Sequence, residues 1–226
     1  MIDNLYSDLD VHCRIFKTIT QLQINQNNFD QQLALGLIYE KGWYIKPDIE
    51  KAIHYYTNAA NHNHLGAQFI LGVIYSDGHY VVQDIKKALH YYSLSAAQNH
   101  LGAQFNLGVI YSEGKYVTRN IDKAIHYYSL AANQNYPHAQ YNLGLIYEEG
   151  RYVARDINKA INYYSLAANQ NYPEAQFSLG LIYEEGQYVA RNIDKAIAYY
   201  SSAANQNHPQ AQFNLGLVYY NGKYVE

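Results

Sequence analysis

A Leu-Gly dipeptide recurs in six copies along the chain at a constant spacing of 36 residues. Its copies are Leu35-Gly36, Leu71-Gly72, Leu107-Gly108, Leu143-Gly144, Leu179-Gly180 and Leu215-Gly216. A fixed period of this length is typical of solenoid proteins, in which each repeat buries its apolar face only against its neighbours. The 226 residues are therefore expected to share one continuous core. Because solenoids mostly present surfaces to other proteins, the period also lowers the expectation of catalysis.

Each repeat carries two helix signals, and the first is clearest in the second repeat. Leu71, Ile74 and Tyr75 have the i, i+3, i+4 spacing of an apolar helix face. They predict a first helix over 67–77. Gly78 is expected to end it, because glycine readily takes the left-handed conformation at a helix C-terminus.

A second apolar stripe in the same repeat predicts another helix over 84–98. Asp84 is expected to be its N-cap and Asn99 its left-handed end. Gly72 and Ala88 recur in register, which predicts a close approach of the two helices. The expected fold class is an all-α, right-handed α-solenoid of antiparallel helix pairs with a 36-residue period, each pair joined by a nine-residue loop.

The motif Ala-x-x-Leu-Gly-x-x-Tyr-x-x-Gly, followed by Asp-x-x-Lys-Ala-x-x-Tyr-Tyr-x-x-Ala-Ala, resembles the Sel1-like repeat, a relative of the tetratricopeptide repeat. The resemblance implies a non-catalytic scaffold or adaptor that binds another protein. The predicted domains are a degenerate N-terminal capping segment, 1–30, and Sel1-like repeats over 31–226. The repeats are 31–66, 67–102, 103–138, 139–174, 175–210 and a partial copy, 211–226.

Tyrosine departs from the family pattern at two places. The second helices carry Tyr-Tyr where the family usually has Trp-Tyr. The loops carry Tyr where the family usually has a second glycine, at Tyr44, Tyr80, Tyr116, Tyr152, Tyr188 and Tyr224. Because Tyr can bury a large area while its hydroxyl stays wet, the loop rings are predicted to pack against their own helix pair or the next repeat.

The two ends of the chain are expected to differ from the middle. Residues 8–25 align with a second helix and predict a capping helix with a more polar outer face, as solenoid termini require. The first helix over 211–220 has no second helix after it, so part of its apolar face is expected to be uncovered. The residues concerned are Leu215, Val218 and Tyr219. A longer natural chain, a partner or a second copy could cover them, and a homodimer through this end is one candidate assembly.

Composition excludes several classes of partner. A net charge of −3 gives no electrostatic reason to expect nucleic acid or an anionic membrane. The N-terminus lacks the pattern of a secretory signal, and no apolar run approaches the ~20 residues that span a bilayer. Cys13 is the only cysteine, and the chain has no Asn-x-Ser/Thr acceptor for glycosylation. The expected location is the cytoplasm.

The candidate interaction surface is the face of the first helices that lines the concave groove of a tetratricopeptide-like solenoid. Aromatic and aliphatic residues would form its floor and glutamates its edge, which suits an extended or helical peptide carrying Lys or Arg. The alternative is that neighbouring helices bury the apolar residues and that the glutamates are simply solvated. The candidate residues are Phe69, Val73, Phe105, Val109, Tyr141, Leu145, Glu148, Glu149, Phe177, Leu181, Glu184 and Glu185.

No catalytic, metal or cofactor site is predicted. His54, His90 and His126 occupy equivalent positions, but repeats lie about 10 Å apart whereas zinc needs ligands at ~2 Å. Adjacent glutamates on a helix point in different directions, which argues against an acid/base pair. Some cysteine-rich Sel1-like proteins have been linked to β-lactam binding, but the cysteine framework is missing here. The predicted function is a protein–protein interaction scaffold; the alternative is a self-associating structural protein joined through the C-terminal helix.

Overall fold

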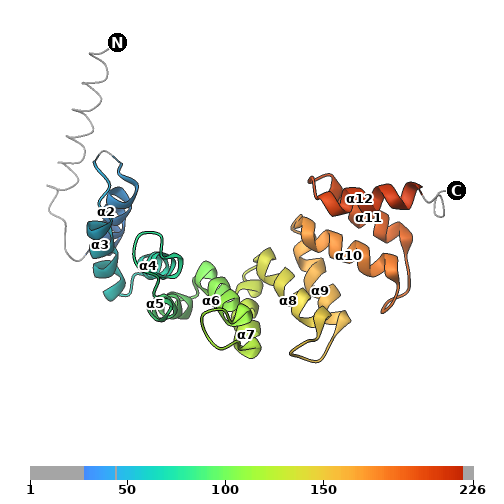
Figure 1. The fold of residues 1–226 in the computed structure, drawn as a ribbon, viewed down its shortest axis with the longest axis horizontal. Helices are drawn as coiled ribbons and strands as arrows, with labels where there is room; N and C mark the ends of the chain where they lie inside the picture. Colours follow the sequence, from blue (N-terminus) through green and yellow to red (C-terminus); the bar gives the residue numbers. More distant parts are fainter. Residues whose placement is uncertain (1–27, 44, 221–226) are drawn as a thin grey trace, which may run out of the picture. The chain divides into compact units, whose positions relative to one another are not determined.

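The structure is a computed structural model that describes residues 28–43 and 45–220. Within these residues it contains eleven α-helices and no β-strand (Figure 1). The first helices of successive repeats are α2 (Phe29–Lys41), α4 (Leu65–Asp77), α6 (Leu101–Glu113), α8 (Pro137–Glu149), α10 (Pro173–Glu185) and α12 (Pro209–Tyr220). The second helices are α3 (Ile49–Asn61), α5 (Ile85–Ala97), α7 (Ile121–Asn133), α9 (Ile157–Ala168) and α11 (Ile193–Ala204). The prediction of an all-α solenoid of helix pairs is confirmed.

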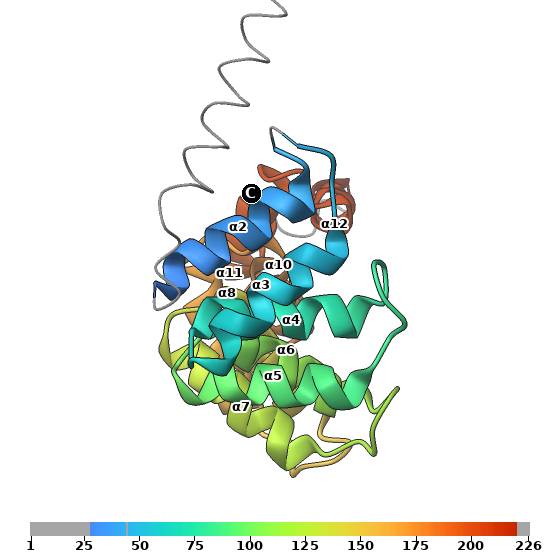
Figure 2. The same cartoon turned by 90° about the vertical axis from the view of Figure 1, so that its left-hand side faces the viewer.

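The helices belong to two compact units, and the boundary between them falls within α6. The N-terminal unit reaches Leu107, and the C-terminal unit begins at Gly108. Within the N-terminal unit, α2 packs on α3 and α4 on α5, as Figure 2 shows for the blue to green part of the chain. Within the C-terminal unit, α8 pairs with α9 and α10 with α11. The predicted capping helix over 8–25 lies outside the described residues.

Local capping sets the helix bounds. The N-cap side chains of the second helices each accept a hydrogen bond from the backbone N–H three residues on, as predicted for Asp84, whose Oδ1 lies 3.0 Å from Lys87 N. Gly78 ends α4 with a left-handed φ of 68°, and Asn99 follows α5 with φ of 66°. The same geometry returns in the other repeats. The N-caps there are Asp48, Asn120, Asp156 and Asn192.

The two helices of a pair approach closely because the ring of a tyrosine lies directly on the glycine. A Cβ at Gly72 would lie 2.4 Å from Tyr92 Cδ1, a distance at which atoms overlap. Ala88 is fully buried nearby, but the tyrosine fills the space that the glycine leaves. The two helices approach closely at Gly72, as predicted. The residue that contacts this glycine is Tyr92, the second tyrosine of the Tyr-Tyr pair, and not Ala88. The equivalent buried rings are Tyr56, Tyr128, Tyr164 and Tyr200.

At the C-terminal end, α12 packs on α11 through one face and leaves another open. Val218 is 3% exposed, so the prediction that it would be uncovered is wrong. It is buried because it faces the core formed with α11. Leu215 is half-buried, and Tyr219 is 53% exposed, as expected for the open face. No helix in the described part of the chain has the length and apolar character that crossing a membrane requires.

Candidate interaction surface

The predicted floor residues are half-buried throughout. In the N-terminal unit, the ring of Phe69 stacks on His100 with centroids 4.4 Å apart and lies 6.0 Å from Tyr92. In the C-terminal unit, Phe177 makes the same two contacts, with His208 and Tyr200. These floor side chains therefore stabilise the packing of neighbouring helices, and only part of each side chain remains available to a ligand. The other half-buried floor positions are Val73, Phe105, Val109, Tyr141, Leu145 and Leu181.

A groove of about 420 Å³ lies along α2 and α4 in the N-terminal unit. Phe69 and Val73, both predicted from the sequence, contribute to its lining. The groove is apolar along the helices and acquires charged and polar groups toward the C-terminal ends of α2 and α4. Its remaining lining residues are Leu37, Glu40, Lys41, Ile70, Ile74, Asp77, His79 and Tyr80.

The predicted acidic edge divides into engaged and exposed carboxylates. Glu184 accepts a hydrogen bond from the Tyr200 hydroxyl at 2.6 Å, and Glu148 accepts one from Tyr164. Burial and the adjacent carboxylate raise the pKa of both tyrosine hydroxyls well above the usual range, so they remain protonated donors. Through these hydrogen bonds the two glutamates link α8 to α9 and α10 to α11. The sequence analysis did not assign them this role.

Glu149 and Glu185 are the exposed members of the edge. Glu149 lies 3.5 Å from Arg151, measured from Oε2 to Nε. An exposed ion pair of this kind contributes little to stability, but it offsets the negative charge that a basic ligand would meet. In the N-terminal unit, Asp77 is exposed at the equivalent end of α4, where its Oδ1 accepts a hydrogen bond from Ser76.

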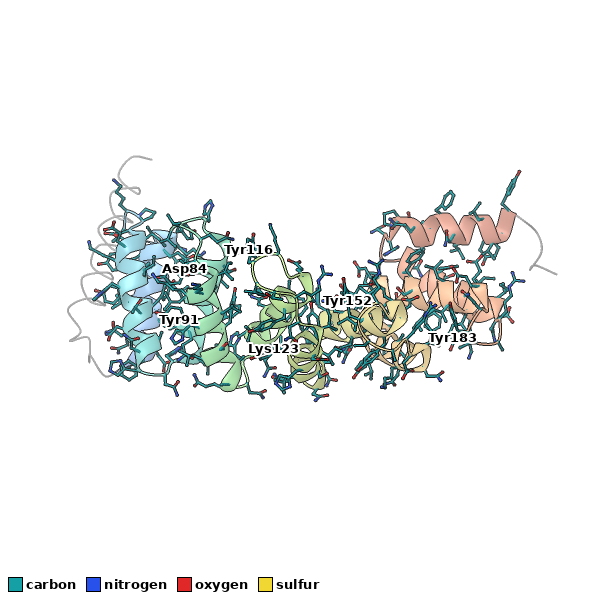
Figure 3. The ribbon with its side chains drawn as sticks, turned by 60° about the horizontal axis from the view of Figure 1, so that its bottom comes forward. Asp84, Tyr91, Tyr116, Lys123, Tyr152 and Tyr183 are labelled. Carbon is teal, nitrogen blue, oxygen red and sulfur yellow. The ribbon has the colours of Figure 1, made fainter. Side chains whose placement is uncertain are left out.

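Arginines contact two loop tyrosines of the C-terminal unit, Tyr152 and Tyr188. Arg119 donates a hydrogen bond to the hydroxyl of Tyr152 and lies over its ring, 5.0 Å from the centroid. Arg155 makes the same contacts with Tyr188 at 4.1 Å. Figure 3 shows Tyr152 on the loop that follows α8. Each arginine thus links its own loop to the loop of the next repeat.

The loop rings are nonetheless more exposed than predicted. Tyr80, Tyr116 and Tyr188 are each 44% exposed and Tyr152 is 58% exposed, so the expectation of packed rings is wrong. Tyr152 and Tyr188 contact an arginine at the ring face and the hydroxyl, and Tyr116 has Lys115 over its ring. The arginines could have been found from the sequence, because Arg119, Arg155 and Arg191 recur at the 36-residue period.

The recurrent lysine at the start of each second helix lies on a tyrosine ring of the first helix. Lys87 Nζ is 4.9 Å from the ring centroid of Tyr75, which stacks on Tyr91 at 5.9 Å. The same nitrogen lies 3.9 Å from Oδ2 of its N-cap, Asp84. The lysine is thus paired with the carboxylate of its own helix cap. Equivalent lysines, among them Lys123 in Figure 3, lie over a first-helix tyrosine in every complete repeat.

Metal-binding geometry is not found in the described residues. Residues 28–43 and 45–220 contain no group of three His, Cys, Asp or Glu side chains that could hold a metal ion. His54, His90 and His126 are exposed, and each meets the ring of the tyrosine that follows it edge to face. They lie on the surface at equivalent positions of successive repeats.

Comparison with known proteins assigns the family. The model of the Sel1 repeat matches the chain six times and covers most of its length. The matched residues are 32–64, 66–100, 102–136, 137–172, 173–208 and 209–226. The chain belongs to the Sel1 repeat family. Sel1 repeat proteins generally serve as scaffolds for protein–protein interaction and are generally non-catalytic.

Solved Sel1 repeat structures resemble this one closely. The crystal structure of c5321, a protective antigen of uropathogenic Escherichia coli with an SLR fold, has a TM-score of 0.82 and 30% identity over 89% of this chain and 43% of the antigen. A Sel1 repeat protein from Oxalobacter formigenes has a TM-score of 0.76 and 34% identity, over 86% of this chain and 56% of that protein. The present chain thus spans about half the length of these two relatives. No curated protein sequence matches it.

Proposed function

We propose that this Sel1 repeat protein is a non-catalytic interaction protein that binds an extended or helical segment of another protein in the groove along α2 and α4. The observation that carries the proposal is the groove itself, a hollow of about 420 Å³ lined by Phe69 and Val73. This volume lies within the range of about 300–1,000 Å³ typical of ligand sites. It would accommodate two or three apolar side chains of a partner segment.

Half-buried apolar side chains supply the floor. Leu37, Phe69, Ile70 and Val73 each keep part of their surface exposed along the groove. Covering such surface contributes about 25 cal/mol per Å² removed from water. A partner segment with two or three apolar side chains at helical or strand spacing would therefore gain most of its affinity here.

The negative charge at one end of the groove favours a partner segment that carries a basic residue beside its apolar side chains. Asp77 is exposed at the end of α4, where the partial negative charge of the helix C-terminus adds to its own. Glu40 is already engaged, since it pairs with Lys41 and accepts a hydrogen bond from Tyr56. In the C-terminal unit, Arg151 offsets Glu149. The groove of the N-terminal unit is therefore the better site for a segment that carries Lys or Arg.

The test is selection of peptides from a random display library on the immobilised full-length chain, followed by measurement of each dissociation constant. Val73→Glu, which places a charge on the floor, should weaken binding of the selected peptides at least about tenfold, equivalent to 1.4 kcal/mol. Val82→Glu is the matched control, because Val82 is 90% exposed on the loop after α4. Circular dichroism checks that both variants remain folded.

A second variant keeps the test independent of folding. Asp77→Lys changes an exposed side chain, and it should weaken peptides that contain Lys or Arg while it leaves neutral peptides unchanged. The same basic peptides should lose affinity as salt rises, because exposed charges are screened within about 8–10 Å. Peptides that bind Val73→Glu and Asp77→Lys as tightly as the wild-type chain would refute the proposal.

A further inference from the structure

The open face of α12 is the same face that a tyrosine of the second helix covers in every complete repeat. Built Cβ atoms at the five equivalent glycines would lie 2.3–2.5 Å from the ring of that tyrosine. At Gly216 a Cβ would meet no atom within 4 Å. The surrounding aromatic side chains are exposed as well, with Phe213 at 67%, Tyr219 at 53% and Tyr220 at 87%.

The α12 sequence also contains the residues that would cover such a glycine. Tyr220 stands where the other first helices carry Glu40, Ser76, Ser112, Glu148 and Glu184. The series Gly216-x-x-Tyr219-Tyr220 therefore has the pattern of a second helix, such as Ala196-x-x-Tyr199-Tyr200 in α11. Within the described residues, α12 is the one first helix that combines the bare glycine of a first helix with the Tyr-Tyr pair of a second helix.

We propose that α12 is a dimerisation helix, which pairs antiparallel with α12 of a second copy of the chain about a two-fold axis. Tyr220 of one copy would cover the partner's Gly216, and the two Tyr219 rings would stack. By symmetry, each copy supplies one glycine and one covering ring, as a two-fold interface requires. This dimer is independent of the groove on α2 and α4.

The register follows from the pairs within the chain. In α4 and α5, Gly72 lies under Tyr92, and Tyr75, three residues further along α4, stacks on Tyr91, one residue earlier in α5. In the proposed dimer, Tyr219 of one copy likewise lies three residues after Gly216, and Tyr219 of the other copy lies one residue before Tyr220. One register thus reproduces both internal contacts.

A third internal contact fits the same register. Phe177, three residues before Gly180, lies 5.8 Å from the ring of Tyr200, which covers that glycine. Phe213 occupies the same position relative to Gly216 and would therefore meet the partner's Tyr220. One arrangement would then cover four exposed residues of α12, namely Phe213, Gly216, Tyr219 and Tyr220.

The size of the contact predicts a weak dimer. An aromatic side chain buries about 150–250 Å², so the exposed parts of Phe213, Tyr219 and Tyr220 amount to roughly 400 Å² per copy. The resulting interface lies at the low end for specific association and is expected to have a dissociation constant on the order of 10–100 µM.

Sedimentation velocity of the full-length chain from about 1 to about 500 µM tests the proposal, because this range brackets the expected constant. The wild-type chain should pass from monomer to dimer. Gly216→Gln, which replaces a glycine with a good helix former where the monomer has no atom within 4 Å, should leave the monomer folded and weaken the dimer at least about tenfold. Tyr220→Ser, the residue found in α4 and α6, should have the same effect.

Leucine provides a matched control. Leu217 on α12 and Leu166 on α9 are each 41% exposed. Leu217→Ala, which truncates an exposed side chain next to Gly216, should weaken the dimer. Leu166→Ala, which truncates a side chain far along the chain from α12, should leave the dissociation constant unchanged. A chain that stays monomeric up to about 500 µM would overturn the proposal, as would a dimer that Gly216→Gln and Tyr220→Ser leave intact.

Discussion

Substitution of alanine for a helix glycine should have opposite effects at two equivalent positions, Gly144 and Gly216. In a helix interior, Gly→Ala alone stabilises by about 1 kcal/mol, because alanine has the higher helix propensity. At Gly144 the added methyl would lie 2.4 Å from Tyr164 Cε1, whereas at Gly216 it would meet nothing within 4 Å. Gly216→Ala should therefore show the propensity gain without a steric cost.

The steric cost at Gly144 can be bounded from the contact. Tyr164 is fully buried, so its ring cannot move into solvent to accommodate the methyl group. Overpacking of this kind costs about 1–3 kcal/mol. Gly144→Ala is thus expected to range from neutral to about 2 kcal/mol less stable than the wild type, and to lie about 1–3 kcal/mol below Gly216→Ala.

Guanidinium denaturation, followed by circular dichroism at a concentration where the chain is monomeric, measures the difference. The double variant Gly144→Ala, Tyr164→Leu supplies the internal check, since removal of the ring should abolish the steric part of the Gly144→Ala effect and give a non-additive cycle. Equal stabilisation by Gly144→Ala and Gly216→Ala would refute the account of the Gly–Tyr contact as the close point of each helix pair.

Three further predictions concern titratable groups. Glu148→Ala should destabilise by about 1–3 kcal/mol, because it leaves the buried hydroxyl of Tyr164 without its carboxylate, whereas Glu149→Ala should change stability by less than about 0.5 kcal/mol in the same denaturation assay. Burial and the glutamate raise the pKa of Tyr164 above its ordinary value of 10.0, so stability should fall as the pH rises above about 10, and Tyr164→Phe should reduce that fall in alkaline melts. Burial lowers the pKa of His100 from 6.5, and its neutral Nδ1 accepts the backbone N–H of Ala103 at 3.2 Å; stability should therefore decrease as the pH falls below about 6.5, and His100→Asn, which keeps a helix cap, should lessen the decrease between melts at about pH 7.5 and 5.5.

The helix pairs could be predicted from the sequence because their limits are set by local interactions. The second helix was expected over 84–98 and runs from Ile85 to Ala97, since its N-cap and left-handed end involve neighbouring residues. The first helix was expected to begin at 67 but begins at Leu65. His64 is its N-cap, through Nδ1, and histidine is not among the residues from which a cap is usually recognised.

The contacts between helices and between repeats were harder to predict, because they depend on side-chain direction. Gly72 and Ala88 indicated a close approach, yet the ring that fills it belongs to Tyr92. Tyr152 was expected to pack against its own helix pair or the next repeat, yet it is 58% exposed and lies under Arg119 from the preceding loop. Such pairings join residues 20 to 33 positions apart, so periodicity locates them without showing which side chains meet.

The candidate site was partly predictable for the same reason. The repeat pattern located Phe69 and Val73, and both line the groove on α2 and α4. It also placed Glu148 and Glu149 together on an acidic edge, because the 36-residue period does not show which of two adjacent side chains is buried and which is exposed. The structure separates them: Glu148 accepts a hydrogen bond from Tyr164, and Glu149 is exposed beside Arg151.

The central claim, that a partner segment binds along α2 and α4, is tested most directly by mapping of amide chemical shifts. A ¹⁵N-labelled full-length chain would be titrated with a peptide selected on it, and the perturbed amides would be assigned. The account predicts that the largest changes fall at 37–41 and 69–80, the stretches that line the groove. Changes confined to the second helices α3 and α5, or to α12, would contradict it.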